Sequence, residues 1–186
     1  MRQWPVELRV ELDDKEAKGY MRELVRRGSD LQPALKRCGI VMTRSFALNF
    51  KQEGRPSHWR PLSANTIAGR RKGSSRILQD TGMLRMSTIS RTAPGNIYHL
   101  SRNMLKMGSN LKYAVYHQFG TQPYIIRPRN AKVLRFTVAG TGRSRKRIVF
   151  AKVVHHPGLP ARPFVVIQDE DVKAMREIFR SYVLGE

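Results

Sequence analysis

The chain has 186 residues, 40% of them hydrophobic, which is enough for one globular core without disulfides or metals. Its formal net charge is +21, and its single cysteine, Cys38, excludes an intramolecular disulfide and is expected to be buried in a helix. The sequence contains neither a run of about 18 apolar residues nor an apolar signal core near its first residues. We therefore expect no membrane contact and synthesis in the cytoplasm.

The charge is distributed unevenly along the chain. Residues 1–53 carry 11 basic and 8 acidic side chains, residues 54–168 carry 21 and 1, and residues 169–186 carry 3 and 5. The one acidic residue of the middle segment is Asp80. A surface of one sign attracts partners of the other sign, so we expect the middle segment to contact nucleic acid or acidic protein faces.

Two helices are predicted before residue 54. Residues 6–12 alternate apolar and polar side chains and predict a short strand or arm. Asp13, with Glu16 three positions later, predicts the start of a helix that ends at Gly28. Asp30 predicts the start of a second helix. The apolar face of this second helix recurs at spacings of three and four residues and comprises Leu31, Leu35, Cys38, Met42 and Phe46.

Short elements separated by turns are predicted in the next part of the chain. The glycine and prolines of residues 51–61 end the second helix, and Ser63 caps a short helix that ends near residue 73. Residues 83–92 predict a strand, and residues 94–109 predict a turn followed by two strands. Residues 113–119 predict one or two helical turns, closed by the glycine that follows.

The C-terminal part predicts a projecting hairpin, residues 132–154, with a Gly-rich tip. Residues 162–167 predict a last strand, and Asp169 begins a final helix. The predicted fold class is α+β, with N-terminal helices, a mostly antiparallel β-sheet and a C-terminal helix packed on the sheet. Residues 1–29 are expected to form an N-terminal arm and helix, and residues 30–186 the main domain.

Patterns typical of catalytic or metal sites are missing from the sequence. Acid–base catalysis by paired carboxylates needs two acids in one cleft, whereas the middle segment has only Asp80, which is expected to cap a turn or pair with Arg76 or Arg85. The five histidines lack the spacings of zinc sites, and no nucleophile elbow or phosphate-binding loop is present. We expect a protein that is not an enzyme, without catalytic residues, cofactor or metal.

Four stretches carry a family resemblance. They are FKQEGRPSHWRPLSANT at 50–66, ILQDTGML at 77–84, MGSNLKYAVYHQFG at 107–120 and PARPFV at 160–165. In this order they resemble the phage virion morphogenesis family, the tail-completion proteins of contractile-tailed and Mu-like phages. The resemblance covers roughly residues 30–184.

The resemblance implies a structural virion protein of the phage neck, with an α+β fold. It implies that the protein completes or terminates the tail and joins the tail to the head. Related proteins act as rings of identical copies, often hexamers, so the expected partners are further copies of the chain, the tail tube and head-side connector proteins.

Candidate interface residues follow from these stretches and comprise Trp59, Tyr113, Tyr116, His117, Phe119 and Arg162. Trp59 is either a core plug or an anchor into a neighbouring subunit. Helical spacing places Tyr113, Tyr116 and Phe119 on one face, with core packing as the alternative to an interface. The proline after Arg162 holds it in an extended conformation, and it is predicted to pair with Asp80 or Asp169.

The tip of the predicted hairpin is a second candidate site. Its basic residues are Arg143, Arg145, Lys146 and Arg147. They can dock on an acidic protein face or contact DNA phosphates non-specifically. The alternative function is therefore a basic nucleic-acid-binding module, whose DNA affinity would fall steeply with salt concentration.

Overall fold

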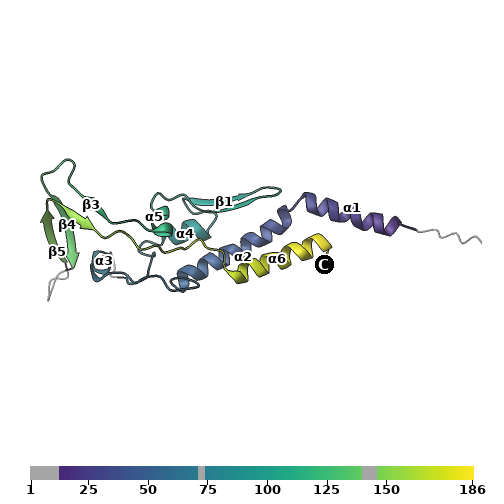
Figure 1. Cartoon of the computed structure of the whole chain (residues 1–186), viewed down its shortest axis with the longest axis horizontal. Coiled ribbons are helices and arrows are strands. Elements are labelled where there is room, and N and C mark those ends of the chain that lie inside the picture. The colour runs from purple at the N-terminus through teal and green to yellow at the C-terminus, as the bar shows by residue number, and fades with distance from the viewer. Residues whose placement is uncertain (1–12, 71–73, 140–145) are drawn as a thin grey trace, which may run out of the picture.

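The structure is a computed structural model that describes residues 13–70, 74–139 and 146–186. The helices are α1 (Lys15–Ser29), α2 (Gln32–Lys51), α3 (Ala64–Gly69), α4 (Met83–Ile89), α5 (Ala114–Phe119) and α6 (Asp169–Leu184). The strands are β1 (Asn96–Leu100), β2 (Leu105–Ser109), β3 (Tyr124–Ile126), β4 (Leu134–Ala139), β5 (Lys146–Ala151) and β6 (Val154–His156). These elements lie along an elongated molecule, with α1, α2 and α6 toward one end and β3, β4 and β5 toward the other, while the β1 strand lies beside α2 and α3 lies near β4 (Figure 1). The predicted α+β class is confirmed.

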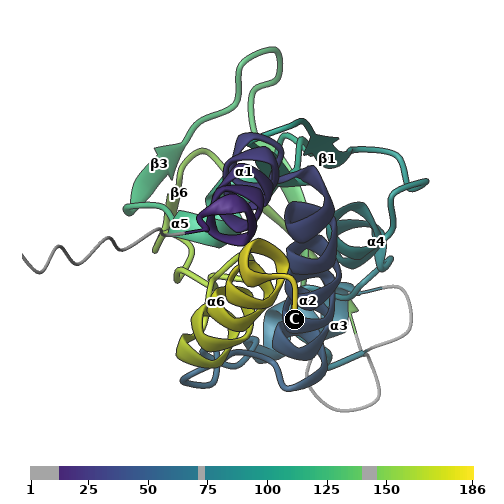
Figure 2. The same ribbon diagram turned by 90° about the vertical axis from the view of Figure 1, so that its right-hand side faces the viewer.

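Helix α2 is the central element of the helical end. The Asp30 carboxylate accepts a hydrogen bond from the backbone N–H of Gln32 at 3.1 Å, as the sequence predicts for a helix start. The predicted apolar face is buried at Cys38, Met42 and Phe46. Helix α6 packs beside α2, and α4 lies on another side of it (Figure 2). The C-terminal helix thus packs mainly on a helix, whereas the sequence analysis placed it on a sheet.

An aromatic cluster forms the core at the C-terminal end of α2. The Phe50 ring lies 5.9 Å from the Trp59 ring and 5.6 Å from the Phe164 ring, measured between centroids. All three side chains are at most 6% exposed. The other buried residues of the cluster are Ile77, Leu78, Leu84 and Ala114. The core therefore joins segments that lie far apart in the sequence.

Arg55 is the centre of a polar network beside this core. Its guanidinium donates to Ser45 Oγ at 2.6 Å, to Asn49 Oδ1 at 2.9 Å and to Glu170 Oε1 at 2.9 Å. Ser45 in turn donates to the buried carboxylate of Asp171 at 2.5 Å. Because Asp171 also accepts the N–H at the start of α6, the network fixes that helix end to α2.

The described strands form three separate antiparallel pairs rather than the one predicted sheet. They are β1–β2, β3–β6 and β4–β5. The predicted hairpin is confirmed as β4–β5, with Phe136 opposite Val149. Its final residues leave that pair, because β6 pairs with β3, a strand that the sequence analysis did not predict. Each pair is short, and a two-stranded pair of this length depends on its neighbours for stability.

Two predicted strands are wrong. Residues 83–92 contain the helix α4, in which Leu84, Ser87 and Thr88 are buried at the three- and four-residue spacing of a helix. Residues 162–167 are extended but have no strand partner in the described chain. The Gln118 side chain substitutes for one: its amide donates to Val165 O at 3.0 Å, and its oxygen accepts from the N–H groups of Phe164 and Val165, both at 3.1 Å.

Helix α1 projects beyond the body of the molecule (Figure 1). None of its residues is buried, and Tyr20, Met21 and Val25 are 50%, 63% and 72% exposed. The contacts to the body lie at its C-terminal end, where Arg27 donates to Val183 O at 3.4 Å, and Tyr182 Oη donates to Asp30 O, just after the helix, at 2.6 Å. Among the described residues, the N-terminal half of α1 therefore has no side chain buried against another element.

Candidate functional site

A pocket of about 870 Å³ lies where five segments of the chain meet. They are residues 60–70, which lead into and form α3; residues 78–84, which lead into α4; Tyr113 and His117 at the start and in the middle of α5; residues 121–123; and residues 156–162. Its charged and aromatic lining residues are Arg60, Arg70, Asp80, Tyr113, His117, His156 and Arg162. We call it the basic pocket, since three arginines face a single carboxylate.

Arg162 is the buried cation of the basic pocket, with 6% of its surface exposed. Its Nε and Nη2 donate to the carbonyl oxygen of Arg60 at 3.1 and 2.9 Å, and Nη2 also lies 3.4 Å from Pro61 O. The prediction that it pairs with Asp80 or Asp169 is therefore wrong. Pro61 and Pro163 favour an extended backbone at the residues before them, Arg60 and Arg162. The groups that meet the guanidinium are therefore backbone carbonyls rather than carboxylates.

Burial and neighbouring positive charge both lower pKa values in the basic pocket. The pKa of Arg162 is lowered, first by burial and then by the neighbouring charges of Arg70 and Arg60. Burial also lowers the pKa of His117, and Arg162 adds to that shift. None of the ion pairs within 4 Å among the described residues involves Asp80, so its predicted pairing with Arg76 or Arg85 is wrong.

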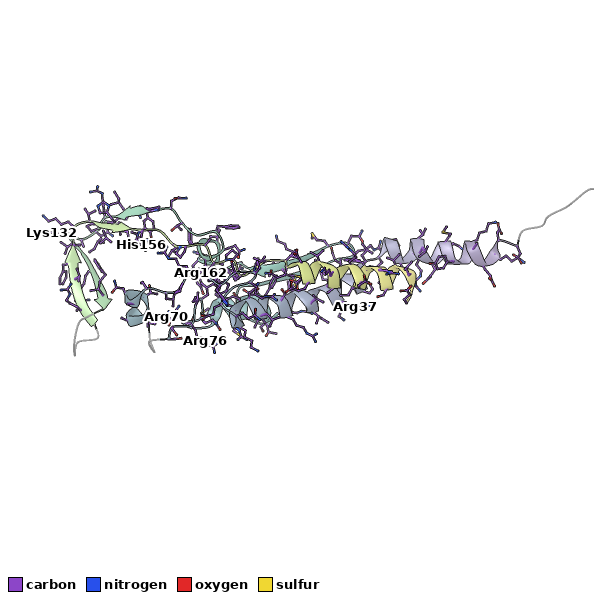
Figure 3. All side chains as sticks on the ribbon, turned by 60° about the horizontal axis from the view of Figure 1, so that its bottom comes forward. Arg37, Arg70, Arg76, Lys132, His156 and Arg162 are labelled. Carbon is purple, nitrogen blue, oxygen red and sulfur yellow. The ribbon has the colours of Figure 1, made fainter. Side chains whose placement is uncertain are left out.

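The labelled side chains give the pocket its place in the molecule. Figure 3 shows Arg70, His156 and Arg162 in the stretch between the helical body, marked by Arg37, and the far strand end, marked by Lys132. His156 stacks on Tyr124 at 4.7 Å between ring centroids, and its Nδ1 accepts the N–H of Gly158 at 3.1 Å.

Helix α5 presents different side chains on two of its sides. Tyr113 and His117 line the basic pocket and contact each other edge to face, with 6.0 Å between ring centroids. Tyr116 and Phe119 lie outside the pocket lining and are 52% and 75% exposed. The expectation that Tyr113 shares one face with Tyr116 and Phe119 is therefore corrected, because six residues separate Tyr113 from Phe119 and the helix turns between them.

The exposed side of α5 also includes Val115, which is 51% exposed and which the sequence analysis missed. Its four-residue spacing from Phe119 was the available signal. Ala114 is buried and Gln118 is bound to the extended segment 162–167, so the opposite side of the helix is fixed to the core. We call Val115, Tyr116 and Phe119 the α5 apolar face.

Trp59 lies in the core, where its indole N–H donates to Pro163 O at 3.1 Å. The structure thus shows Trp59 as a buried core residue rather than as an exposed anchor for a neighbouring subunit. Arg143 and Arg145 lie outside the described residues. The backbone of Lys146 begins β5, and the Arg147 side chain, opposite Val138, is exposed.

The described residues contain no group of three or more histidine, cysteine or acidic side chains placed to hold a metal ion. Within the same ranges, every helix is too short or too polar to cross a membrane. The candidate site therefore consists of the basic pocket and the α5 apolar face beside it.

Comparison with known proteins gives one match. Residues 12–184, nearly the whole described chain, match the phage virion morphogenesis family. No curated protein and no solved structure matches the chain. The match extends further toward the N-terminus than the roughly 30–184 expected from the four motif stretches, and it includes α1. The chain belongs to the phage virion morphogenesis family.

Proposed function

We propose that the protein is a structural component of the phage neck. It completes or terminates the tail and joins it to the head as a ring of identical copies. Membership of the virion morphogenesis family supports a role in building the particle rather than in catalysis. The tail tube and the head-side connector are the expected neighbours, and acidic faces on these proteins would meet the positively charged middle segment.

The observation that carries this proposal is the α5 apolar face. An apolar face rigidly attached to the core and open to solvent is typical of a protein–protein interface. Phe119, at 75% exposure, is too large an apolar group to leave in water when a partner is present. A contact between this face and a different surface of the next copy would repeat around an axis and close into a ring.

Sedimentation of the purified chain tests the ring. We expect the wild-type protein to form a closed oligomer and Phe119→Asp to remain a monomer, since a buried carboxylate would oppose the contact. Met104→Asp is the matched control, because Met104 is also an exposed apolar residue, 51% exposed, in the β1–β2 hairpin. A monomeric wild-type protein that is also absent from purified particles in electron micrographs would contradict the proposal.

A second candidate function, binding to DNA, is favoured by the charge at the strand end. The exposed basic residues there are Arg127, Arg129, Lys132, Arg135 and Arg147, and the whole middle segment contains one acid. This function predicts DNA affinity that falls linearly on a log–log plot against salt, with a slope set by the phosphates contacted. A gel shift that is absent even at low salt would exclude it.

A further inference from the structure

We propose that the basic pocket binds the acidic N-terminal segment, residues 6–16, of a second copy of the chain. The inference rests on the ring described above and identifies one of its contacts. It is carried by the unbalanced charge of the pocket, by the position of the acidic residues in the sequence, and by the distance between the two sites within one chain.

Among the described residues, the lining of the basic pocket carries more positive than negative charge. Arg60, Arg70 and Arg162 line it together with one carboxylate, Asp80, and none of the described ion pairs includes any of the four. Burial is the first cause of the lowered Arg162 pKa, and the neighbouring guanidinium groups of Arg70 and Arg60 add to it, since like charges brought together raise the energy of the charged forms. A carboxylate entering the pocket would offset that repulsion.

The shape and remaining lining of the basic pocket suit a peptide. Its volume of about 870 Å³ is that of a ligand-sized site. Apolar side chains form much of the wall, including Leu62, Leu78, Met83, Leu84 and Leu159. A DNA duplex carries its phosphates on a convex surface and does not enter such a pocket, whereas a peptide with both acidic and apolar side chains does.

The chain itself contains such a peptide. Residues 6–16 read VELRVELDDKE, with five acids, two bases and four apolar residues. In the described part of this segment, Asp13 and Glu16 are exposed at the start of α1. The other acidic cluster, at the start of α6, is already used, since Glu170 pairs with Arg55 and Asp171 accepts from Ser45.

The acidic segment cannot reach the basic pocket of its own chain. Helices α1 and α2 lie roughly end to end along the long axis, so the start of α1 lies far from the residues that line the pocket (Figure 1). The 15 and 20 residues of these helices span about 22 and about 30 Å at 1.5 Å per residue. The eight residues from Lys15 back to Glu7 reach at most about 29 Å. Binding therefore requires a second copy.

The resulting contact joins two different surfaces of the molecule, the region at the start of α1 and the basic pocket. Contacts of this kind generate rings when the rotation between copies closes. The exposed apolar stripe of α1, comprising Tyr20, Met21 and Val25, would then lie against the neighbouring copy as well. The proposed contact thus gives a partner to α1, none of whose residues is buried in the part of the chain that the structure describes.

Peptide binding tests this contact separately from ring formation. The probe is a fluorescein-labelled peptide of residues 6–16, titrated by fluorescence anisotropy. The receptor is the full chain with Glu7, Glu11 and Glu16 changed to Gln and Asp13 and Asp14 to Asn, so that its own segments do not compete. We expect saturable binding, and no saturable binding of a control peptide in which the five acids are replaced by amides.

The decisive variant is Arg60→Glu in the same receptor, because the Arg60 side chain is exposed and the carbonyl that holds Arg162 is unchanged. We expect affinity to fall at least about ten-fold. Arg129→Glu is the control, because it makes the same charge change outside the pocket. It should lower the affinity for the peptide much less. A peptide with Lys at positions 7 and 11 should bind Arg60→Glu better than it binds the original receptor.

Equal losses of peptide affinity in Arg60→Glu and Arg129→Glu would show that the peptide responds to the net charge of the protein rather than to the pocket. This result would overturn the proposal. Failure of the peptide to saturate the receptor would also overturn it and would assign the pocket to another protein of the particle. Sedimentation of the wild-type chain separates these results from the proposed function, since a ring that forms without peptide binding overturns only the contact proposed here.

Discussion

Helices α1 and α2 follow each other in the sequence and have similar lengths, yet they differ in how far their side chains are buried against the rest of the chain. Both have an apolar stripe at helical spacing. Eight residues of α2 are buried, whereas no residue of α1 is. Helix α1 is instead supported by pairs within itself, such as Asp14 with Lys18 at 2.6 Å and Glu23 with Arg26 at 2.6 Å. An amphipathic pattern therefore predicts that a face will be covered, but not which chain covers it.

The largest expected effect comes from the core end of α2. Phe50→Ala should lower the free energy of unfolding by about 3–5 kcal/mol, because a completely buried ring is removed from contact with Trp59 and Phe164. Urea unfolding followed by circular dichroism measures the change. Val25→Ala, on the exposed side of α1, is the control and should change the value by less than about 0.5 kcal/mol. Similar losses of unfolding free energy in both variants would show that α1 and α2 contribute equally to stability, contrary to the difference in their burial.

The next effect comes from the polar network that joins α2 to α6. Asp171→Asn should cost about 1.5–3 kcal/mol, since a buried carboxylate that accepts from Ser45 Oγ and from the backbone N–H of Gln168 loses its charge. The same urea unfolding experiment measures it. Glu177→Gln, on the exposed side of the same helix, should leave the midpoint nearly unchanged. A neutral result for Asp171→Asn would mean that helix packing alone holds α6 in place.

The smallest effect is expected within α1. Side-chain hydrogen bonds from Arg26 lower the pKa of Glu23 from 4.5 to about 2, and Arg27 adds to the shift. The charged pair therefore supports the helix fully above pH 4.5 and is lost as the pH falls through about 2. Protection factors of the α1 amides, which are exchange rates corrected for the intrinsic pH dependence, should fall over this window in the wild-type protein more than in Glu23→Gln. The difference should vanish at 1 M salt, where the screening length is about 3 Å.

Local signals predicted the helices whose ends carry caps and whose faces are continuous. Asp30 at the start of α2, Ser63 before α3 and the acidic start of α6 all lie where the sequence places them. Helix α4 was predicted as a strand because residues 83–92 have no helix cap and contain β-branched residues. Packing against α2 and the β1–β2 pair decided the outcome, and a local pattern does not contain that contact.

The partners of single polar side chains were harder to predict. A carboxylate is the expected partner for a buried arginine, but Arg162 donates to carbonyls of residues about one hundred positions away. The Gln118 amide takes the place of a neighbouring strand for residues 162–167, so a strand was predicted where only an extended segment exists. Both arrangements depend on contacts between distant segments, which neither periodicity nor composition specifies.

The aromatic core also determines when the protein can fold during synthesis. Phe164 and Asp171, which complete the core and the polar network, are made about one hundred residues after Phe50 and Trp59. Chains emerge from the ribosome N-terminus first, so the two earlier aromatics lack these contacts until the segment around Phe164 has been translated. A chain that ends before this segment would leave the core incomplete and open to proteolysis.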